Sequence, residues 1–526
     1  MATVQRSHAT ERTASAPRPP APTAPMWSVV HRGGVHGSPQ PRRAACPGSW
    51  RGFAAQTALV RTIEWLTASR LHSRYRAMLA FDRLPRASRR RRRERRLAAL
   101  LRQARRRVPL WRERLAHLGP AALADPIASL ATLPPLTKDD LREGFPQRLV
   151  DPVHSHNTRM VSSSGTADRV SLIHDFDKRD TARAAELRVL HRLLGRPLGG
   201  RSVELPPDAC NILCGIEDPQ AQPVSALLRR ALFGADPTAR EQARRALRGR
   251  LERSALFART VLPPLAPAPW PDLVAQLDDR LDRIAALRPR LLRGLPLYLV
   301  WLAQRAEQRG ITLPGLERIA PFGGLLSPHM AARVERAFGA RFVNAYGSSE
   351  LGSVAVGCGH SPFMHLFEDL FIVEIEDGGR PVPDGQPGRL LITDLSNRAM
   401  PLLRYAPGDV AIRLRGPCPC GLDTERILVC GREQERLTSA ADDAVDAIEL
   451  LDLAFAHPAL INVAYEQRGD RLTARVVTLE RGDEICRSLA ASLAARFGPR
   501  VRVRTTTVLR PEASGKYRTA RRSARP

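Results

Sequence analysis

Lysine is scarce in this chain. Only three of its 82 basic residues are lysine, namely Lys138, Lys178 and Lys516, whereas 79 are arginine. An ammonium group is a compact point charge and a guanidinium is a broad planar fork, so the two are not interchangeable where the geometry is tight. A chain that avoids lysine to this degree is expected to keep it where arginine cannot substitute.

Long apolar runs are also missing. The best candidate, residues 291–302, is interrupted by Arg293, Gly294 and Pro296, and it is shorter than the roughly 18–20 apolar residues that span a bilayer. The first 25 residues lack the apolar core of a secretory signal. We therefore expect a cytoplasmic protein without a transmembrane segment.

The formal charge of +29 is unevenly distributed. Residues 1–118 contain 26 Arg and only five Asp or Glu. One interpretation of the arginines in residues 88–107 is a basic arm for RNA or an anionic membrane. We favour a helix with arginines on its solvated side, because apolar residues recur there at helical spacing. These residues are Leu97, Leu100, Leu101, Ala104 and Val108. Aromatic residues are only 5% of the chain and form no stacking platform, so we expect no specific nucleic-acid partner.

The alternation of helix-like and strand-like stretches along the sequence predicts an α/β protein with several domains. Residues 1–87 read as a basic, largely disordered extension, and residues 88–432 as a large region of alternating helices and strands. Within that region, residues 366–429 are rich in strands and turns and indicate a β-rich subdomain. Residues 433–526 are expected to form a small, mobile α+β domain.

Five short segments carry groups that can bind a nucleotide. Ser163-Ser164-Gly165-Thr166 offers hydroxyls and backbone N–H groups for phosphate oxygens. Tyr346-Gly347-Ser348-Ser349-Glu350 joins an aromatic ring to hydroxyls and a Mg²⁺-type carboxylate. Asp409 can accept hydrogen bonds from two ribose hydroxyls, and Arg432 and Lys516 follow in two further glycine turns. Each segment alone is equally typical of an ordinary polar turn.

In combination, these segments resemble the adenylate-forming superfamily of acyl-CoA synthetases, within it the phenylacetate–CoA ligase branch and its capsule-biosynthesis relatives. The resemblance covers about residues 90–520. It is carried by VPLWRERL (108–115), LPPLTKDDLRE (133–143), SSSGT (162–166), PFGGLLSP (321–328), AYGSSELG (345–352), HLFEDLFIVEI (365–375), PVPDGQPGRLLITDL (381–395), AMPLLRYAPGD (399–409), CPCG (418–421) and CGRE (430–433).

The resemblance implies an enzyme that activates a small carboxylic acid, possibly an aromatic one, with ATP and Mg²⁺ and then transfers it to CoA or another acceptor. The serine-rich loop would hold the β- and γ-phosphates, and Tyr346 and Gly347 would border the adenine and acid pockets. Ser348 belongs to the same nucleotide-binding turn, whereas Ser349 and Glu350 would serve the α-phosphate and Mg²⁺. Asp409 and Arg432 would hold the ribose. Lys516, on a mobile C-terminal lid, would stabilise the reacting centre.

The chain departs from the family pattern at four places. The phosphate loop reads Ser-Gly-Thr-Ala-Asp-Arg where relatives usually have a second Thr and a Gly, and Leu325 stands where many relatives have Glu. The hinge reads GREQE, and the stretch that follows it lacks the usual glycines. Adenylation is therefore better supported than CoA transfer. A relative that binds nucleotide or acyl ligand without turnover remains the alternative.

The cysteines predict a structural zinc site. Cys358, Cys418 and Cys420 lie near His360 and His365 in the sequence, and thiolates with an imidazole are the four-coordinate set that zinc prefers. We favour Cys358, His365, Cys418 and Cys420 as ligands, with His360 as the substitute for His365. Buried free thiols are the alternative interpretation. A homodimer is a further possibility.

Overall fold

The structure is a computed structural model. It describes residues 70–119, 124–153, 158–162, 170–195, 201–207, 224–237 and 259–523, with isolated positions at 58–65 and 239–247. These residues belong to one compact unit, Trp50–Pro526, and every structural statement below concerns them. None of the described helices is both long and apolar enough to cross a membrane.

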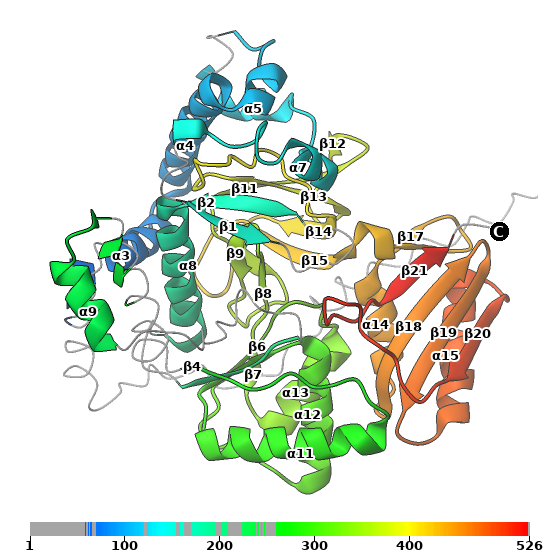
Figure 1. Ribbon diagram of the computed structural model, residues 1–526. Helices are drawn as coiled ribbons and strands as arrows, with labels where there is room; N and C mark the ends of the chain where they lie inside the picture. Colours follow the sequence, from blue (N-terminus) through cyan, green and yellow to red (C-terminus); the bar gives the residue numbers. More distant parts are fainter. Residues whose placement is uncertain are drawn as a thin grey trace, which may run out of the picture. The chain divides into compact units, whose positions relative to one another are not determined.

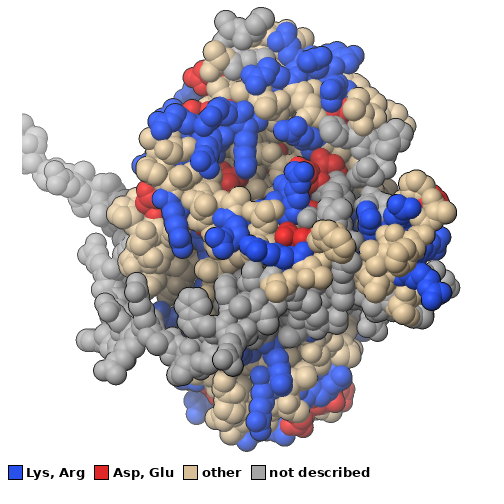
Figure 2. Space-filling model, turned by 90° about the vertical axis from the view of Figure 1, so that its left-hand side faces the viewer, with Lys and Arg blue, Asp and Glu red and all other residues tan. Residues whose placement is uncertain are grey.

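Helices form most of the first part of the described chain. They are α3 (Leu71–Asp82), α4 (Arg86–Arg107), α5 (Pro109–Arg114), α6 (Pro126–Ala131) and α7 (Lys138–Gly144). The expected helix is present as α4, and its apolar face is buried as predicted. Figure 2 views the side of the molecule on which α4 lies in Figure 1, and Lys and Arg side chains gather there.

Helix α3 is the described helix within the predicted N-terminal extension, whose bounds stay a prediction. It lies within residues 1–87, yet its apolar side chains Leu71, Tyr75, Met78 and Phe81 are buried. The helix packs against α8 (Phe176–Leu194). The helical spacing of these four residues satisfies the same rule that identified α4, but the surrounding arginines obscured it. The packed domain therefore includes residues 71–82.

A five-stranded parallel sheet forms one layer. Its order is β4-β3-β5-β6-β7, from Arg259–Val261, Ser202–Leu205, Leu291–Gly294, Arg318–Pro321 and Arg341–Phe342. Helices α11 (Trp270–Leu287), α12 (Pro296–Arg309) and α13 (Pro328–Phe338) pack beside it and share its apolar core (Figure 1). Parallel strands buried in this way present their carboxyl ends at one edge, where ligands commonly bind in α/β proteins.

The largest described sheet, called the central sheet below, has eight strands, and all its pairings are antiparallel. Its order is β12-β11-β13-β14-β15-β10-β9-β8. The strands are β8 (Ala345–Ser348), β9 (Gly352–Val356), β10 (Met364–Leu366), β11 (Phe371–Asp377), β12 (Arg380–Pro381), β13 (Pro387–Asp394), β14 (Asp409–Leu414) and β15 (Arg426–Arg432). The sheet thus begins before residue 366, where the sequence placed the β-rich region. The hairpin β1 (Thr158–Ser162) and β2 (Ser171–Asp175) leads into α8, and α9 (Val224–Phe233) is a separate short helix.

The C-terminal part is α+β, as expected. Its four-stranded sheet has the order β20-β19-β18-β21, from Val501–Thr505, Arg471–Thr478, Leu460–Arg468 and Ala520–Ser523. The remaining elements are η4 (Glu433–Glu435), β16 (Leu437–Thr438), β17 (Ala444–Val445), α14 (Ala447–Phe455) and α15 (Gly482–Phe497). The mixed architecture, with helices and several sheets, confirms the prediction of an α/β fold. The boundary at residues 432 and 433, and the mobility of the part that follows, stay predictions.

Candidate active site and cysteine–histidine cluster

Three residues from three separate motifs meet at one point of the central sheet. Asp409 and Arg432 are paired across β14 and β15, and the Arg432 Nε lies 3.1 Å from the Asp409 Oδ1. The Tyr346 hydroxyl, from β8, donates to the Asp409 Oδ2 at 2.6 Å. Burial and the charge of Asp409 raise the pKa of Tyr346, while Asp409 raises that of Arg432. The phenol therefore stays protonated and the guanidinium stays charged.

Glu350 lies buried in the turn between β8 and β9. The Tyr405 hydroxyl donates to its Oε1 at 3.4 Å, and burial raises the pKa of Tyr405, which keeps that phenol a donor. The turn itself is closed by the Leu351 N–H, which donates to the Ser348 Oγ at 3.3 Å. Sequence reasoning did not single out Tyr405, although it stands four residues before Asp409 in the same motif.

Gly347 is required by backbone packing in this turn. A Cβ at this position would lie 2.4 Å from the Gly352 carbonyl oxygen, which is closer than any real contact. The neighbouring strand therefore approaches too closely for any side chain. Gly347 thus lets Tyr346 and Glu350 occupy opposite ends of one short, tightly paired turn.

Lys516 reaches toward the carboxyl end of the parallel sheet. It lies in a turn before β21, where its carbonyl accepts from the Glu512 N–H at 2.8 Å and Gly515 has a φ of +73°. Its Cε lies 3.5 Å from the position of the Cβ that Gly323 lacks. Gly323 follows β6 and has a φ of +75°. A shallow hollow opens beside this contact, lined by Leu295, Gly323, Gly324, Tyr517 and Arg518 among others.

The proposed phosphate loop lies outside the described residues. Strand β1 ends at Ser162 and the description resumes at Val170. The roles expected for Ser163, Ser164, Gly165 and Thr166 therefore rest on the sequence alone.

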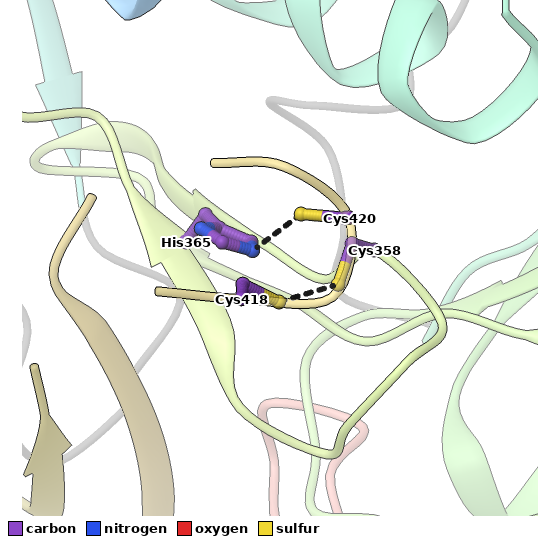
Figure 3. Close-up of side chains that lie close together, drawn as sticks. All are labelled: Cys358, His365, Cys418 and Cys420. Atoms are coloured by element: carbon purple, nitrogen blue, oxygen red, sulfur yellow. Dashed lines mark hydrogen bonds between the residues drawn. The ribbon is translucent and has the colours of Figure 1, made fainter. Parts of the chain in front are cut away.

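A cluster of three cysteines and one histidine lies elsewhere on the central sheet (Figure 3). One ligand atom of each of Cys358, His365, Cys418 and Cys420 lies within 4.8 Å of all the others. The Cys358 and Cys418 sulfurs are 3.6 Å apart, and the Cys420 sulfur lies 3.3 Å from the His365 Nε2. The hydrogen bond with Cys420 holds the pKa of Cys358 well below its usual range. These are the four residues that the sequence favoured, and the exposed His360 is outside the group.

Thr424 orients the histidine of this cluster and was missed by sequence reasoning. Its hydroxyl lies 2.8 Å from the His365 Nδ1, so the opposite nitrogen, Nε2, is the one directed at the sulfurs. Metal-binding histidines commonly bond through their second nitrogen in this way. Thr424 lies four residues after Cys420, and a lone threonine near a cysteine pair gives no signal in the sequence.

Known proteins similar to this chain are phenylacetate–coenzyme A ligases. That of Thermus thermophilus is 26% identical over 375 residues, which are 68% of this chain and 73% of that protein. That of Pseudomonas putida is 27% identical over 326 residues, 60% of this chain and 64% of that protein. No protein-family model matches the chain.

Solved structures share the fold. The 2-hydroxyisobutyryl-CoA ligase in its postadenylation state with 2-HIB-AMP gives a TM-score of 0.64 at 20% identity, covering 84% of this chain and 90% of that one. Its open conformation with 2-HIB-AMP and CoA gives a TM-score of 0.51 at 20% identity, covering 81% and 90%. The resemblance to the phenylacetate–CoA ligase branch and the expected ligase fold are thereby confirmed.

Proposed function

We propose that this chain, a relative of the phenylacetate–CoA ligases with the fold of the adenylate-forming superfamily, activates a carboxylic acid with ATP as its acyl-adenylate and passes the acyl group to CoA. The observation that carries the proposal is the joint arrangement of Tyr346, Asp409 and Arg432. Tyr346 and Arg432 each bond one carboxylate oxygen of Asp409. A phenol, a carboxylate and a guanidinium from three separate motifs thereby meet at one point.

Asp409 is assigned to the ribose. Its two oxygens accept from Tyr346 and Arg432 at opposite sides, and each oxygen keeps a further lone pair for a ribose hydroxyl. Arg432 is held by the Pro407 carbonyl at 2.9 Å, which aims its remaining N–H groups. Tyr346 and Gly347 would border the adenine and the acid.

The residues of the β8–β9 turn are assigned to the phosphates. Ser348 and Ser349 supply hydroxyls, and the Glu350 carboxylate is the residue that would hold Mg²⁺. A single carboxylate suits this ion, because Mg²⁺ is usually bound by one or two carboxylates together with substrate phosphates. When bound, the ion would neutralise charge on the phosphate oxygens.

Lys516 is assigned to the reacting centre. The substrate carboxylate attacks the α-phosphorus of ATP, an oxygen–phosphorus bond forms, and pyrophosphate leaves with the electrons of the broken bond. Negative charge gathers on the oxygens around phosphorus, and an ammonium fixed there stabilises it. The CoA thiolate then attacks the acyl carbon, and AMP leaves.

We also propose that Cys358, His365, Cys418 and Cys420 hold a structural zinc ion. With Zn–S bonds of about 2.3 Å, two sulfur ligands of a tetrahedral site lie about 3.8 Å apart, and a sulfur and a nitrogen lie slightly closer. The observed separations of 3.6 and 3.3 Å are close to this spacing. Four protein ligands leave no position for substrate, so the ion would support the fold and take no part in the reaction.

Acid-dependent pyrophosphate release from ATP, over aromatic and aliphatic acids with and without CoA, tests the proposal. Release that requires an acid, with an acyl-CoA product, supports it. Pyrophosphate release without an acyl-CoA product would indicate that the acyl acceptor is a nucleophile other than CoA. Tight ATP binding without release across the panel would favour the alternative of a binding protein, which the altered phosphate loop motivates.

A further inference from the structure

Lys178 is buried inside the molecule and bonded on two sides. It lies in the first turn of α8 with 1% of its surface exposed. Its Nζ lies 2.6 Å from the Asp394 Oδ2 and donates to the Leu351 carbonyl oxygen at 2.7 Å. The Phe371 ring, whose centroid is 5.2 Å away, also faces the ammonium. Burying a charge is costly unless the group is paired and hydrogen-bonded, and here both conditions hold.

A second side chain from the same region binds the adjacent carbonyl. The His174 Nε2, at the end of β2, lies 3.0 Å from the Glu350 carbonyl oxygen. Burial and then the charge of Lys178 lower the pKa of His174 to about 4, so the ring is neutral at physiological pH. A carbonyl oxygen only accepts, so the proton must be on Nε2. His174 and Lys178 thus hold two successive carbonyls, those of Glu350 and Leu351.

The partners of Lys178 are themselves fixed. The Asp394 Oδ1 accepts from the backbone N–H and the hydroxyl of Ser396, at 2.8 and 2.6 Å. Asp175 caps α8 by accepting from the Lys178 N–H, and its other oxygen accepts from the Arg398 and Ala399 N–H groups. The backbone of Lys178 and its partner Asp394 are therefore both held in place, and the ammonium contacts the turn that carries Glu350.

We propose that Lys178 is a positioning residue for Glu350: it fixes the Glu350–Leu351 segment through the Leu351 carbonyl and so sets the direction of the Glu350 carboxylate. The inference rests on the proposed function, in which Glu350 serves the phosphates and Mg²⁺. It also explains why this arginine-rich chain has a lysine here. A compact ammonium reaches a carboxylate and a carbonyl from one point, whereas a planar guanidinium is too broad for so enclosed a site.

The double variant Lys178→Met/Asp394→Asn tests this role. It removes both buried charges together, which is far less disruptive than leaving one unpaired, and the new amide keeps an oxygen that can accept from Ser396. We expect a folded protein in which kcat/KM for Mg·ATP falls at least about tenfold, since small misplacements of a binding group cost that much. Lys178→Arg, which keeps the charge, should lose as much. Unchanged kinetics in either folded variant would overturn the proposal.

The matched control is Arg188→Met/Asp369→Asn. Arg188 lies on the same helix, is fully buried, and its Nη1 pairs with the Asp369 Oδ1 at 2.6 Å. Its second partner, Asp82, keeps its ion pair with Arg192 in this variant. Neither Arg188 nor Asp369 bonds the Glu350–Leu351 segment in the contacts described, so this variant should lose stability but keep kcat/KM. An equal kinetic loss in the control would show that Lys178 acts only through general stability, and would overturn the inference.

Two further measurements separate this inference from the proposed function. In a Glu350→Gln background, removing the Lys178–Asp394 pair should cost little more, because residues that act through one group are not additive. Fully additive losses would contradict the inference. If the wild-type protein releases no pyrophosphate, the proposed function fails, and hydrogen exchange still tests the positioning. Amides 345–356 should then exchange faster in the Lys178 variant than in the control, and equal exchange would refute the role.

Discussion

The two ends of one hairpin, β14 and β15, differ in chemistry. At one end Asp409 faces Arg432, and the β8 residue Tyr346 joins them. At the other end, beyond the pair of Leu414 and Arg426, the connecting loop carries two of the three cysteines of the cluster, Cys418 and Cys420. The first end combines opposite charges with a phenol, and the second combines sulfur with imidazole. A single pair of strands thus supports both proposed sites.

The two ends differ in whether their polar groups are open to a ligand. The Arg432 side chain is 40% exposed, and each oxygen of Asp409 makes one described bond, so this end can accept a ligand. At the other end the four ligand atoms face one another and His365 is fully buried. An open set of polar groups is suited to exchange of substrates, whereas a closed set is suited to holding an ion permanently. Changes at the first end should therefore affect kinetics, and changes at the second should affect stability.

The largest effect is expected at Lys516. Lys516→Ala should reduce kcat and kcat/KM for adenylation together, by about 10²-fold or more, as for the loss of one fixed donor to a developing charge. Lys516→Arg should fail nearly as badly because the guanidinium is broader. Single-turnover adenylate formation measures the step, with Lys138→Ala as the control. Thioester formation from pre-made acyl-adenylate should survive. Near wild-type adenylation by Lys516→Ala would contradict the assignment.

Cys418→Ser should affect stability more than chemistry. Replacing one of four proposed zinc ligands should lower the melting temperature by about 5 °C, while kcat changes little in the protein that remains folded. Calorimetry and metal analysis measure both effects, and about one zinc ion per wild-type chain is expected. Cys486→Ser, a half-buried thiol outside the cluster, is the control. Wild-type protein purified without chelator and free of zinc would exclude the site.

Asp409→Asn should weaken nucleotide binding. It removes the charge that faces Arg432 and one acceptor for the ribose, so KM for ATP should rise about tenfold, or ~1.4 kcal/mol, with a smaller change in kcat. Steady-state kinetics at saturating acid measure the change. Asp384→Asn, which alters a carboxylate paired with Arg413 and Arg415, is the matched control. Equal KM values for Asp409→Asn and the wild type would refute the ribose assignment.

The smallest effect is expected from removing residues 1–69. This truncation ends before α3, so we expect the melting temperature to stay within about 2 °C of the full chain, with both ends of the hairpin unaffected. Removing residues 1–82 should be clearly destabilising, because it exposes the surface that buries Leu71, Tyr75, Met78 and Phe81. It also deletes Asp82, the partner of Arg188 and Arg192. If both truncations melt alike, α3 is not part of the core.

Patterns along the chain were enough to predict the family resemblance, the mixed helix and sheet architecture, and the apolar face of α4. These depend on local spacing and on residue order, which can be read without knowing the fold. The same patterns favoured the four residues of the cysteine–histidine cluster, because few residue types ligate zinc. Helix α3 was not predicted because its short apolar pattern stands among arginines. The predicted β-rich subdomain, residues 366–429, does not include β8 and β9, because these strands contain glycines and serines that look like turns.

Which side chains meet became clear only from the folded chain. Tyr346 and Asp409 are 63 residues apart, and Lys178 and Leu351 are 173 apart, so strand pairing and helix packing bring them together. Tyr405 and Thr424 gave no signal for the same reason, since their roles consist of one hydrogen bond to a distant residue. The scarcity of lysine did mark Lys178 in the sequence. Its burial beside Asp394 supplies the physical reason, because only an enclosed site distinguishes a compact ammonium from a planar guanidinium.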